Sequence, residues 1–232
     1  MSAPLLDIRN ITMQFGGLKA VDSLSFQVFK GQLAGLIGPN GAGKTTVFNM
    51  LTGVYKPTMG EVAFESKIIS NLKPYEISSH GLTRTFQNIR LFKELTVLEN
   101  VLIANHQHVK YTWTDALFLT KSFSSEEKKI LNQAKEILNI FGLSSKLNEK
   151  SCNLPYGEQR KLEIVRALMT NPKMILLDEP AAGMNHSETH SLMDLIAKIR
   201  KDFNLTVLLI EHDMKLVMGI CEQIFVLDHG VK

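Results

Sequence analysis

The sequence contains few cysteines, one tryptophan and no long hydrophobic run. Its 232 residues include two cysteines, Cys152 and Cys221, which are isolated from each other. Neither a disulfide framework nor a cysteine-based metal site is therefore expected. No stretch approaches the ~18 consecutive apolar residues of a membrane-spanning helix, and the longest apolar runs have the length of a β-strand. The chain is not expected to span a membrane by itself.

The sequence also lacks a large excess of charge of either sign. Its 26 Lys and Arg residues against 23 Asp and Glu residues give a net charge of +3, spread along the chain. There is no basic stripe interleaved with aromatic residues, so nucleic acid is not expected as a partner. The first ten residues lack the basic-then-apolar order of a secretory signal, which favours a cytoplasmic location. The remaining composition is that of an ordinary globular domain.

Short apolar segments separated by turn signals predict two kinds of sheet. In the first third, residues 6–15, 24–28 and 62–69 are expected to form strands of an antiparallel sheet. In the last third, strands and helices alternate, which indicates a parallel sheet with helices on both faces. The strands expected there are 174–177, 205–210 and 224–227, and the helices are 158–170, 187–203 and 213–221.

The middle of the chain has a different character and is expected to be mostly helical. Apolar residues recur with helical period from Ile130 to Phe141, and Gly142 ends the run. Ser124 and Glu127 have the spacing of a capping box, which predicts the start of this helix. The sequence thus predicts an α/β protein with an inserted helical lobe.

The most specific motif is the segment Gly38-Pro39-Asn40-Gly41-Ala42-Gly43-Lys44-Thr45, followed by Thr46. It matches the phosphate-binding (Walker A) pattern between an apolar strand, 33–37, and a helical stretch. Glycines let backbone N–H groups turn toward phosphates, Lys44 supplies a cation for the β and γ oxygens, and Thr45 offers a hydroxyl to Mg²⁺. A purely structural glycine-rich turn is the alternative, and the strand-loop-helix order disfavours it.

Acidic residues follow two of the expected parallel strands. Asp178 ends one of them and is placed at the carboxyl edge of the sheet, where it should hold Mg²⁺ through water. Glu179 is the candidate for the residue that polarises the attacking water. The strand 205–210 leads into Glu211-His212-Asp213, which brings His212 to the same edge. Taken alone, a histidine after a strand is more often structural than functional.

In this order, the motifs resemble those of the ATP-binding subunit of an ABC transporter. The resemblance covers essentially the whole chain. It implies one ABC-type P-loop ATPase domain over 1–232: a nucleotide-binding core, 1–88 and 154–232, that includes an antiparallel β part, and a helical subdomain, 89–153. The segments that carry the resemblance are 38–45, Gln87, 154–159, 174–179, 182–185 and His212.

The resemblance implies further roles for single residues. Phe15 falls where the family stacks an aromatic ring on adenine. Gln87 falls where a glutamine touches Mg²⁺ and the attacking water, so that Gln87, Glu179 and His212 are the expected catalytic residues, and Thr45, Gln87 and Asp178 the expected metal-site residues. Nucleotide contacts across a subunit interface are expected from Tyr156, Gly157, Glu158 and Asn185.

Two positions depart from the general family pattern. Pro155 stands where a signature serine would meet the γ-phosphate, and Asn185 stands where an aspartate usually lies. These departures concern the contacts made across the interface between two subunits. The chain also stops at Lys232, where members of the family continue with a further hairpin turn and a short helix, so either a truncated chain or an incomplete family C-terminus is expected.

Three longer sequence segments resemble, more specifically, the ATP-binding subunits of high-affinity branched-chain amino-acid importers. These segments are 84–92, 154–160 and 210–214. Urea and amide importers and the lipopolysaccharide-export ATPase remain as alternatives. The resemblance implies ATP and Mg²⁺ as ligands, a homodimer or a heterodimer with a paralogue, and separate transmembrane permease subunits. It further implies an extracytoplasmic solute-binding protein as an indirect partner and a place on the cytoplasmic face of the membrane.

Three other interpretations remain open at this point. A soluble ABC-type ATPase acting on DNA or ribosomes would usually carry a coiled-coil insertion or tandem halves, which do not fit in this length. A P-loop kinase would need an acceptor pocket in place of the segment 154–159. Phe92, Leu95, Val97 and Leu98 could form either a groove for a permease helix or internal core of the helical lobe.

Overall fold

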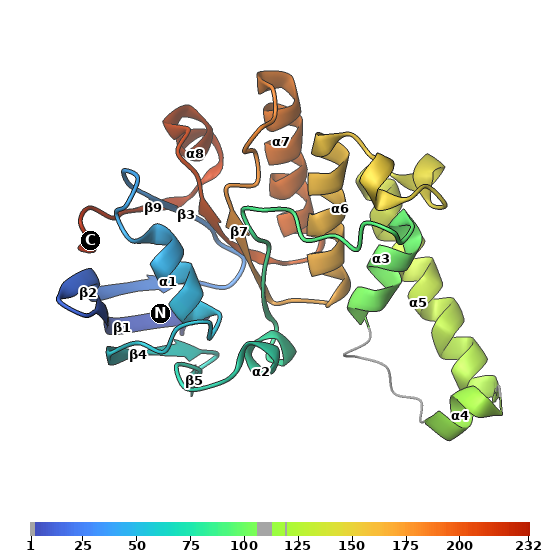
Figure 1. The fold of residues 1–232 in the computed structure, drawn as a ribbon, viewed down its shortest axis with the longest axis horizontal. Helices are drawn as coiled ribbons and strands as arrows, with labels where there is room; N and C mark the ends of the chain where they lie inside the picture. Colours follow the sequence, from blue (N-terminus) through green and yellow to red (C-terminus); the bar gives the residue numbers. More distant parts are fainter. Residues whose placement is uncertain (1–2, 106–112, 119) are drawn as a thin grey trace. The chain divides into compact units, whose positions relative to one another are not determined.

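The computed structural model describes residues 3–105, 113–118 and 120–232. The chain divides into two compact units (Figure 1). Unit 1 comprises Met1–Gln87 and Pro172–Lys232, and unit 2 comprises Asn88–Asn171. This division differs from the expected one at its second junction, because residues 154–171, which the sequence assigned to the nucleotide-binding core, are grouped with the helical unit.

An antiparallel sheet is formed by the first part of unit 1. It contains β1 (Leu6–Phe15), β2 (Leu18–Val28), β4 (Met59–Phe64) and β5 (Lys67–Ile68), in the order β2-β1-β4-β5. The expected single strand 62–69 is wrong. Glu65 and Ser66 have φ angles of 49° and 64°, so the chain turns there and folds back as a β4-β5 hairpin.

The second sheet of unit 1 is entirely parallel. It contains β3 (Leu33–Ile37), β6 (Leu82–Arg84), β7 (Met174–Asp178), β8 (Thr206–Ile210) and β9 (Gln223–Val226). The order is β6-β7-β8-β3-β9. Every residue of β3, β7 and β8 is buried, which explains their continuous apolar runs. The carboxyl ends of these three strands lie at one edge of the sheet.

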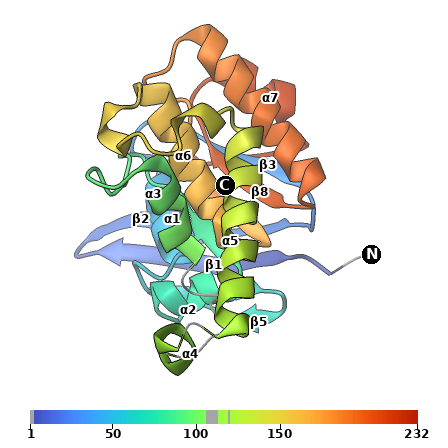
Figure 2. The ribbon, with the colours of Figure 1, turned by 90° about the vertical axis from the view of Figure 1, so that its right-hand side faces the viewer.

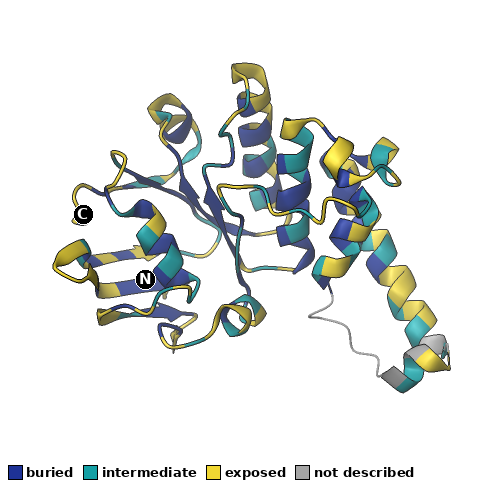
Figure 3. Ribbon diagram, viewed as in Figure 1, coloured by how far each residue is buried: buried dark blue, intermediate teal, exposed yellow. Residues whose placement is uncertain are grey.

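Three longer helices of unit 1 pack against these strands: α1 (Lys44–Leu51), α7 (His186–Asp202) and α8 (Met214–Ile220). The helix α1 is apolar on most sides, and its Val47, Phe48 and Leu51 belong to one hydrophobic core with residues of both sheets. In Figure 1, α7 and α8 lie on the side of the parallel sheet away from α1. The burial colours of Figure 3 show β3, β7 and β8 as buried.

Two short elements of unit 1, α2 (Pro74–Ser79) and β6, were not anticipated. Both are too short to show a hydrophobic period, and β6 is recognised only through its pairing with β7.

Unit 2 is helical, as expected. It contains α3 (Val97–Ala104), α4 (Trp113–Leu117), α5 (Lys121–Ile140) and α6 (Tyr156–Met169), with two short 3-10 turns at Ser144–Lys146 and Ser151–Asn153. The helices α3, α5 and α6 contact one another pairwise, and Figure 2 shows α5 running beside α6. Among the described residues, none of the helices combines the length and apolar character needed to cross a membrane.

The start of α5 corrects another expectation. The helix begins at Lys121, and its N-cap is Thr120, whose hydroxyl oxygen accepts from the Phe123 N–H at 3.3 Å. Ser124 therefore lies inside the helix and is not its cap, since Thr120 supplies the same chemistry one turn earlier. A capping box does form at α3, where Thr96 and Glu99 exchange hydrogen bonds between side chain and backbone.

Candidate functional site

The expected phosphate-binding loop lies between β3 and α1, and its glycines are required by the backbone. Gly43 is the N-cap of α1 with a φ of 102°. A Cβ atom at Gly43 would lie 2.5 Å from the Ala20 carbonyl oxygen, and one at Gly38 would lie 2.0 Å from the Leu227 carbonyl oxygen. No other residue type fits these two positions without displacing the backbone. The loop is therefore held in one shape by strands on both sides of it.

Lys44 is folded back over this loop. Its ammonium group donates to the carbonyl oxygens of Gly38 and Pro39, at 2.7 and 2.9 Å, and the residue is only 7% exposed. Thr45 is exposed beside it. A nearly buried cation at the N-terminus of a buried helix is an environment that favours an anion. The residues 38–46 thus fit the phosphates of a nucleotide.

Asp178, the expected Mg²⁺ ligand, is the last residue of β7 and takes part in a buried ion pair. Its Oδ2 lies 2.6 Å from Nη2 of Arg84, and the two side chains are 2% and 5% exposed. Arg84 also donates to Oδ1 of Asn49 on α1, at 2.7 Å. Its guanidinium carbon lies 5.4 Å and 5.1 Å from the ring centroids of Phe48 and Phe86. This arginine connects α1, β6 and β7 at the edge where the phosphate-binding loop begins.

Glu179 and Gln87, two of the expected catalytic residues, are brought into direct contact. The Gln87 side-chain amide donates to Oε2 of Glu179 at 3.0 Å. Glu179 has a φ of 48°, an uncommon conformation for a residue with a side chain. Such a conformation costs about 1–3 kcal/mol and persists only where the surroundings hold it. The Glu179 N–H donates to the Ile210 carbonyl at 3.0 Å, which anchors the residue to the end of β8.

His212 lies two residues beyond the end of β8 and is exposed. Its Nδ1 lies 3.7 Å from Oε2 of Glu211, a carboxylate that is 2% exposed. The Glu211 carboxylate accepts from the backbone N–H groups of Ala181 and His212, at 3.1 and 3.2 Å. Burial is the largest influence on this carboxyl and raises its pKa above the usual value; these hydrogen bonds oppose the shift, and the nearby Glu179 adds to it.

Phe15 and Asn185 are both on the surface of unit 1. The Phe15 ring is 44% exposed and meets Tyr55 edge to face, with centroids 5.4 Å apart. A ring held at its edge with an accessible face is suited to stacking on a base. Asn185 is the N-cap of α7, where its side-chain oxygen accepts from the Glu188 N–H at 2.9 Å. Its amide therefore already has a structural role at the helix start.

The expected signature residues all belong to unit 2. Tyr156, Gly157 and Glu158 form the first turn of α6, and Pro155 is its N-cap, without a side-chain hydrogen bond. Behind them, the buried Arg160 donates to Oε2 of Glu163 at 2.8 Å and to the Tyr156 hydroxyl at 3.2 Å. The first turn of α6 is thus braced from within by an ion pair, and its Glu158 N–H donates to the Pro155 carbonyl at 2.9 Å.

The apolar segment after Gln87 is divided between the interior and the surface of unit 2. Val97 is fully buried in unit 2, whereas Phe92 is exposed and lies under the guanidinium of Arg166. A small hollow of about 140 Å³ in unit 2 includes Leu91 and Lys93 in its lining, together with Cys152. Val97 is therefore core, and Phe92 is on the surface.

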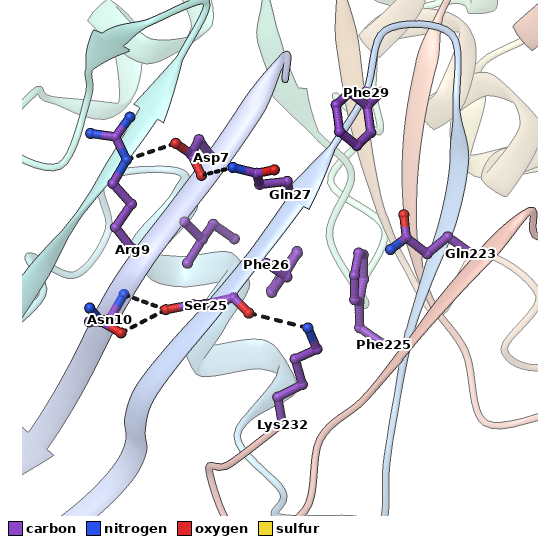
Figure 4. Close-up of a pocket in the computed structure, with 11 residues that line it drawn as sticks. Asp7, Arg9, Asn10, Ser25, Phe26, Gln27, Phe29, Gln223, Phe225 and Lys232 are labelled. Atoms are coloured by element: carbon purple, nitrogen blue, oxygen red, sulfur yellow. Dashed lines mark hydrogen bonds and ion pairs between the residues drawn. The ribbon is translucent and has the colours of Figure 1, made fainter. Parts of the chain in front are cut away.

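A larger hollow on unit 1, of about 590 Å³, lies away from the residues expected to bind nucleotide. Figure 4 shows it between β1, β2 and β9, with Lys232 reaching toward the backbone of Ser25. Its polar walls are already paired: Arg9 bonds Asp7 at 2.7 Å, and Ser25 bonds Asn10 at 2.8 Å. None of the residues expected at the nucleotide site lines it.

Sequence reasoning missed Arg84 and Glu211 as members of the site. Both lie within three residues of an expected catalytic residue, but a single arginine in a short strand or a glutamate beside a histidine carries no signal by itself. Their burial, which only the fold reveals, is what distinguishes them.

In the described part of the chain, no cluster of three or more His, Cys, Asp or Glu side chains is arranged to hold a metal ion.

Comparison with known proteins finds relatives along almost the whole chain. A family profile described as ABC transporter matches residues 21–182. The chain is 48% identical over 230 residues to the high-affinity branched-chain amino acid transport ATP-binding protein BraF of Pseudomonas aeruginosa and 47% identical to the corresponding protein LivG of Escherichia coli K12. Each comparison covers 99% of this chain and 90% of the relative.

Solved structures agree with the fold. The crystal structure of the ADP conformation of an ATP-binding cassette of an ABC transporter is 37% identical, with a TM-score of 0.85, and the match covers 99% of this chain and 89% of the other. A nucleotide-free cassette is 36% identical with a TM-score of 0.84. The expected antiparallel and parallel sheets, and the expected P-loop ATPase fold, are confirmed.

Proposed function

Because this chain belongs to the ABC transporter family, as an ATPase of that family, we propose that it powers the import of branched-chain amino acids. The substrate assignment is supported by the names of relatives that are 47–48% identical over nearly the whole length. In this role the chain pairs with a second ATPase subunit, identical or paralogous, and docks on separate permease subunits at the cytoplasmic face of the membrane. An extracytoplasmic solute-binding protein supplies the amino acid to the permease.

The proposed ATP hydrolysis is supported chiefly by one observation: several motifs meet at one edge of the parallel sheet. The strands β7, β8 and β3 are neighbours in the sheet. The loop 38–46, which contains Lys44, follows β3, an acidic residue ends β7, and His212 lies just beyond β8. At this edge Gln87 and Glu179 are hydrogen bonded at 3.0 Å. Phosphate binding and water activation therefore have residues of suited chemistry side by side.

In the proposed reaction Lys44 and the backbone amides of the loop bind the β and γ phosphates of ATP. Glu179 orients and polarises the attacking water, Gln87 holds the Glu179 carboxylate through its amide, and His212 contacts the γ-phosphate. Mg²⁺, held by Thr45, Asp178 and Gln87, would neutralise phosphate charge when bound. Phe15 stacks on the adenine.

Residues of unit 2 serve the nucleotide of the other subunit. The first turn of α6, which contains Tyr156, Gly157 and Glu158, directs the N–H groups of Tyr156 and Gly157 and the positive end of the helix at that nucleotide's γ-phosphate. Asn185 lies in the segment that crosses the interface. Each subunit pair then forms two composite sites, and ATP closes them.

Two substitutions test the ATPase assignment. Glu179→Gln keeps the shape of the side chain and removes its charge, so we expect normal ATP affinity and a nearly complete loss of phosphate release. Lys44→Ala removes the cation from the phosphate loop, so we expect ATP affinity itself to fall. Near-normal phosphate release by the first variant, or unchanged nucleotide affinity of the second, would contradict these roles.

The transport assignment needs a separate experiment. We expect the chain to co-purify from native membranes with permease subunits of a branched-chain amino-acid importer, and the isolated chain to bind ATP but not leucine, isoleucine or valine by calorimetry. Recovery of urea, amide or lipopolysaccharide-export permeases would contradict the proposed substrate and assign the chain to one of those transporters instead. Saturable leucine binding to this chain alone would contradict the proposal that other subunits recognise the substrate.

A further inference from the structure

Glu211 is a buried carboxylate to which the proposed reaction gives no task. It is the first residue after β8 and is 2% exposed. Burying a carboxylate is costly unless other groups bond to it. The groups that bond to Glu211 therefore indicate why an acidic residue is present at this position.

Its two oxygens reach two different segments. Oε1 accepts from the Ala181 N–H at 3.1 Å, and Oε2 accepts from the His212 N–H at 3.2 Å and lies 3.7 Å from the His212 ring nitrogen Nδ1. Ala181 lies two residues after Glu179, and His212 is the expected γ-phosphate contact. One side chain thus bonds to both segments that carry proposed catalytic residues.

The turn after β7 shows what the first of these bonds does. The Ala182 N–H donates to the Glu179 carbonyl at 3.1 Å, and the Glu179 N–H donates to Ile210 at 3.0 Å. These backbone bonds close the turn, and the Ala181 N–H between them is taken by the Glu211 carboxylate. Without this acceptor the turn could relax, and Glu179 could leave its unfavourable φ of 48°.

We propose that Glu211 is a positioning residue for hydrolysis, which locks the turn bearing Glu179 and the loop bearing His212 in one common arrangement. The proposal rests on the proposed ATPase function. Glu211 acts through the two segments it holds and does not touch the reacting atoms. Because Glu179 must orient a water molecule, a displacement of the turn by 1 Å is enough to lower the rate by about 100-fold.

Steady-state kinetics give the first test. In Glu211→Ala we expect kcat to fall by about 100-fold, with a KM for ATP within about twofold of the native value, because the phosphate loop is untouched. Glu211→Gln keeps an oxygen for the Ala181 N–H, so we expect its kcat within about tenfold of native. Glu211→Asp keeps the carboxylate but shortens the side chain by one methylene, which moves it away from the Ala181 N–H. This variant replaces Glu211→Ala in the test if Glu211→Ala does not fold.

Glu222→Ala is the matched control. It removes a carboxylate that is 51% exposed and pairs with Arg200, away from the turn, so kcat should be unchanged. Combining Glu211→Ala with Glu179→Gln should add little to the loss caused by Glu179→Gln alone, because both changes affect the same step.

Amide hydrogen exchange at Ala181 gives a test that needs no turnover. Exchange of this N–H should accelerate by at least about tenfold in Glu211→Ala and remain native in Glu222→Ala. A folded Glu211→Ala protein with native kcat, or with native exchange at Ala181, would overturn the proposal. Native protein that releases no phosphate would instead overturn the ATPase function, and the exchange measurement would still decide whether Glu211 holds the turn.

Discussion

Arg84 and Asp178 form an ion pair of 2.6 Å in which both side chains are almost fully buried. The arginine lies in β6, three positions before Gln87, and the aspartate ends β7. Asn49 and two aromatic rings complete the surroundings of the guanidinium group. The acidic residue at the proposed metal position is thus balanced by an internal cation, and the pair fixes the neighbouring ends of three elements.

Loss of this pair should destabilise the fold strongly. In Arg84→Met the buried Asp178 carboxylate loses its counter-charge, so we expect the free energy of unfolding to fall by about 3–5 kcal/mol. Urea denaturation without nucleotide measures it. Lys150→Met, which breaks an exposed ion pair with Glu94, should lower the free energy of unfolding far less. Adding Asp178→Asn to Arg84→Met should restore part of the loss; a double variant less stable than the single one would contradict this account.

The N-terminal end of α6 should tolerate a hydroxyl group at Pro155 but not a negative charge at Gly157. Pro155→Ser offers the γ-phosphate of the partner site one neutral hydrogen bond, worth about 0.5–1.5 kcal/mol, so the steady-state ATPase rate should change by less than about tenfold. Gly157→Asp places a negative charge beside that phosphate and should nearly abolish activity. An aspartate in the first turn suits the helix dipole, so the protein should still fold.

Gly157→Ala separates bulk from charge at this position, and its rate should fall between those of the native protein and Gly157→Asp. A large gain in rate for Pro155→Ser, or an active Gly157→Asp variant, would mean that the backbone N–H groups of α6 are not what recognises the phosphate.

The two cysteines should differ sharply in reactivity. Cys152 is exposed, whereas burial raises the pKa of the Cys221 thiol to about 12. Because the thiolate is the reactive form, iodoacetamide at pH 7.5 should modify one thiol per folded chain, at Cys152. Peptide mass spectrometry identifies the site. Cys152→Ser should abolish the reaction, and unfolding in urea should expose the second thiol. Rapid labelling of Cys221 in the folded protein would contradict the raised pKa of its thiol.

Glu211 should also influence how stability depends on pH. Its folded-state pKa is raised above the usual 4.5, mainly by burial, so the folded protein holds this proton more tightly than the unfolded chain. Its stabilising contribution is complete below pH 4.5 and is lost as pH rises through the folded-state pKa. The free energy of unfolding of the native protein should therefore fall relative to that of Glu211→Gln as the pH rises over the range above 4.5. A difference that is constant over this range would contradict the raised pKa.

The sequence predicted those parts of the site that depend on local patterns. The loop 38–45 and the strands that precede Asp178 and His212 are contiguous in the chain, so spacing and hydrophobicity were sufficient. Arg84 and Glu211 were missed because their roles arise from pairing with residues about 94 and 30 positions away, which no local period encodes. The β4-β5 hairpin was missed because Glu65 and Ser66 are not typical turn residues at positive φ.

The position of β3 in its sheet has a consequence for how the protein is made. The strand that leads into the phosphate-binding loop is synthesised before unit 2, yet its two hydrogen-bonded neighbours, β8 and β9, are synthesised after unit 2. A nascent chain that carries the complete loop therefore has no sheet in which to hold it. The protein acquires its nucleotide site only after β8 and β9 have left the ribosome, so ATP cannot guide the folding of a nascent chain that ends before them. Strands that are so far apart in the sequence also pair slowly. The apolar β3 is therefore exposed to aggregation until β8 and β9 have been synthesised and pair with it.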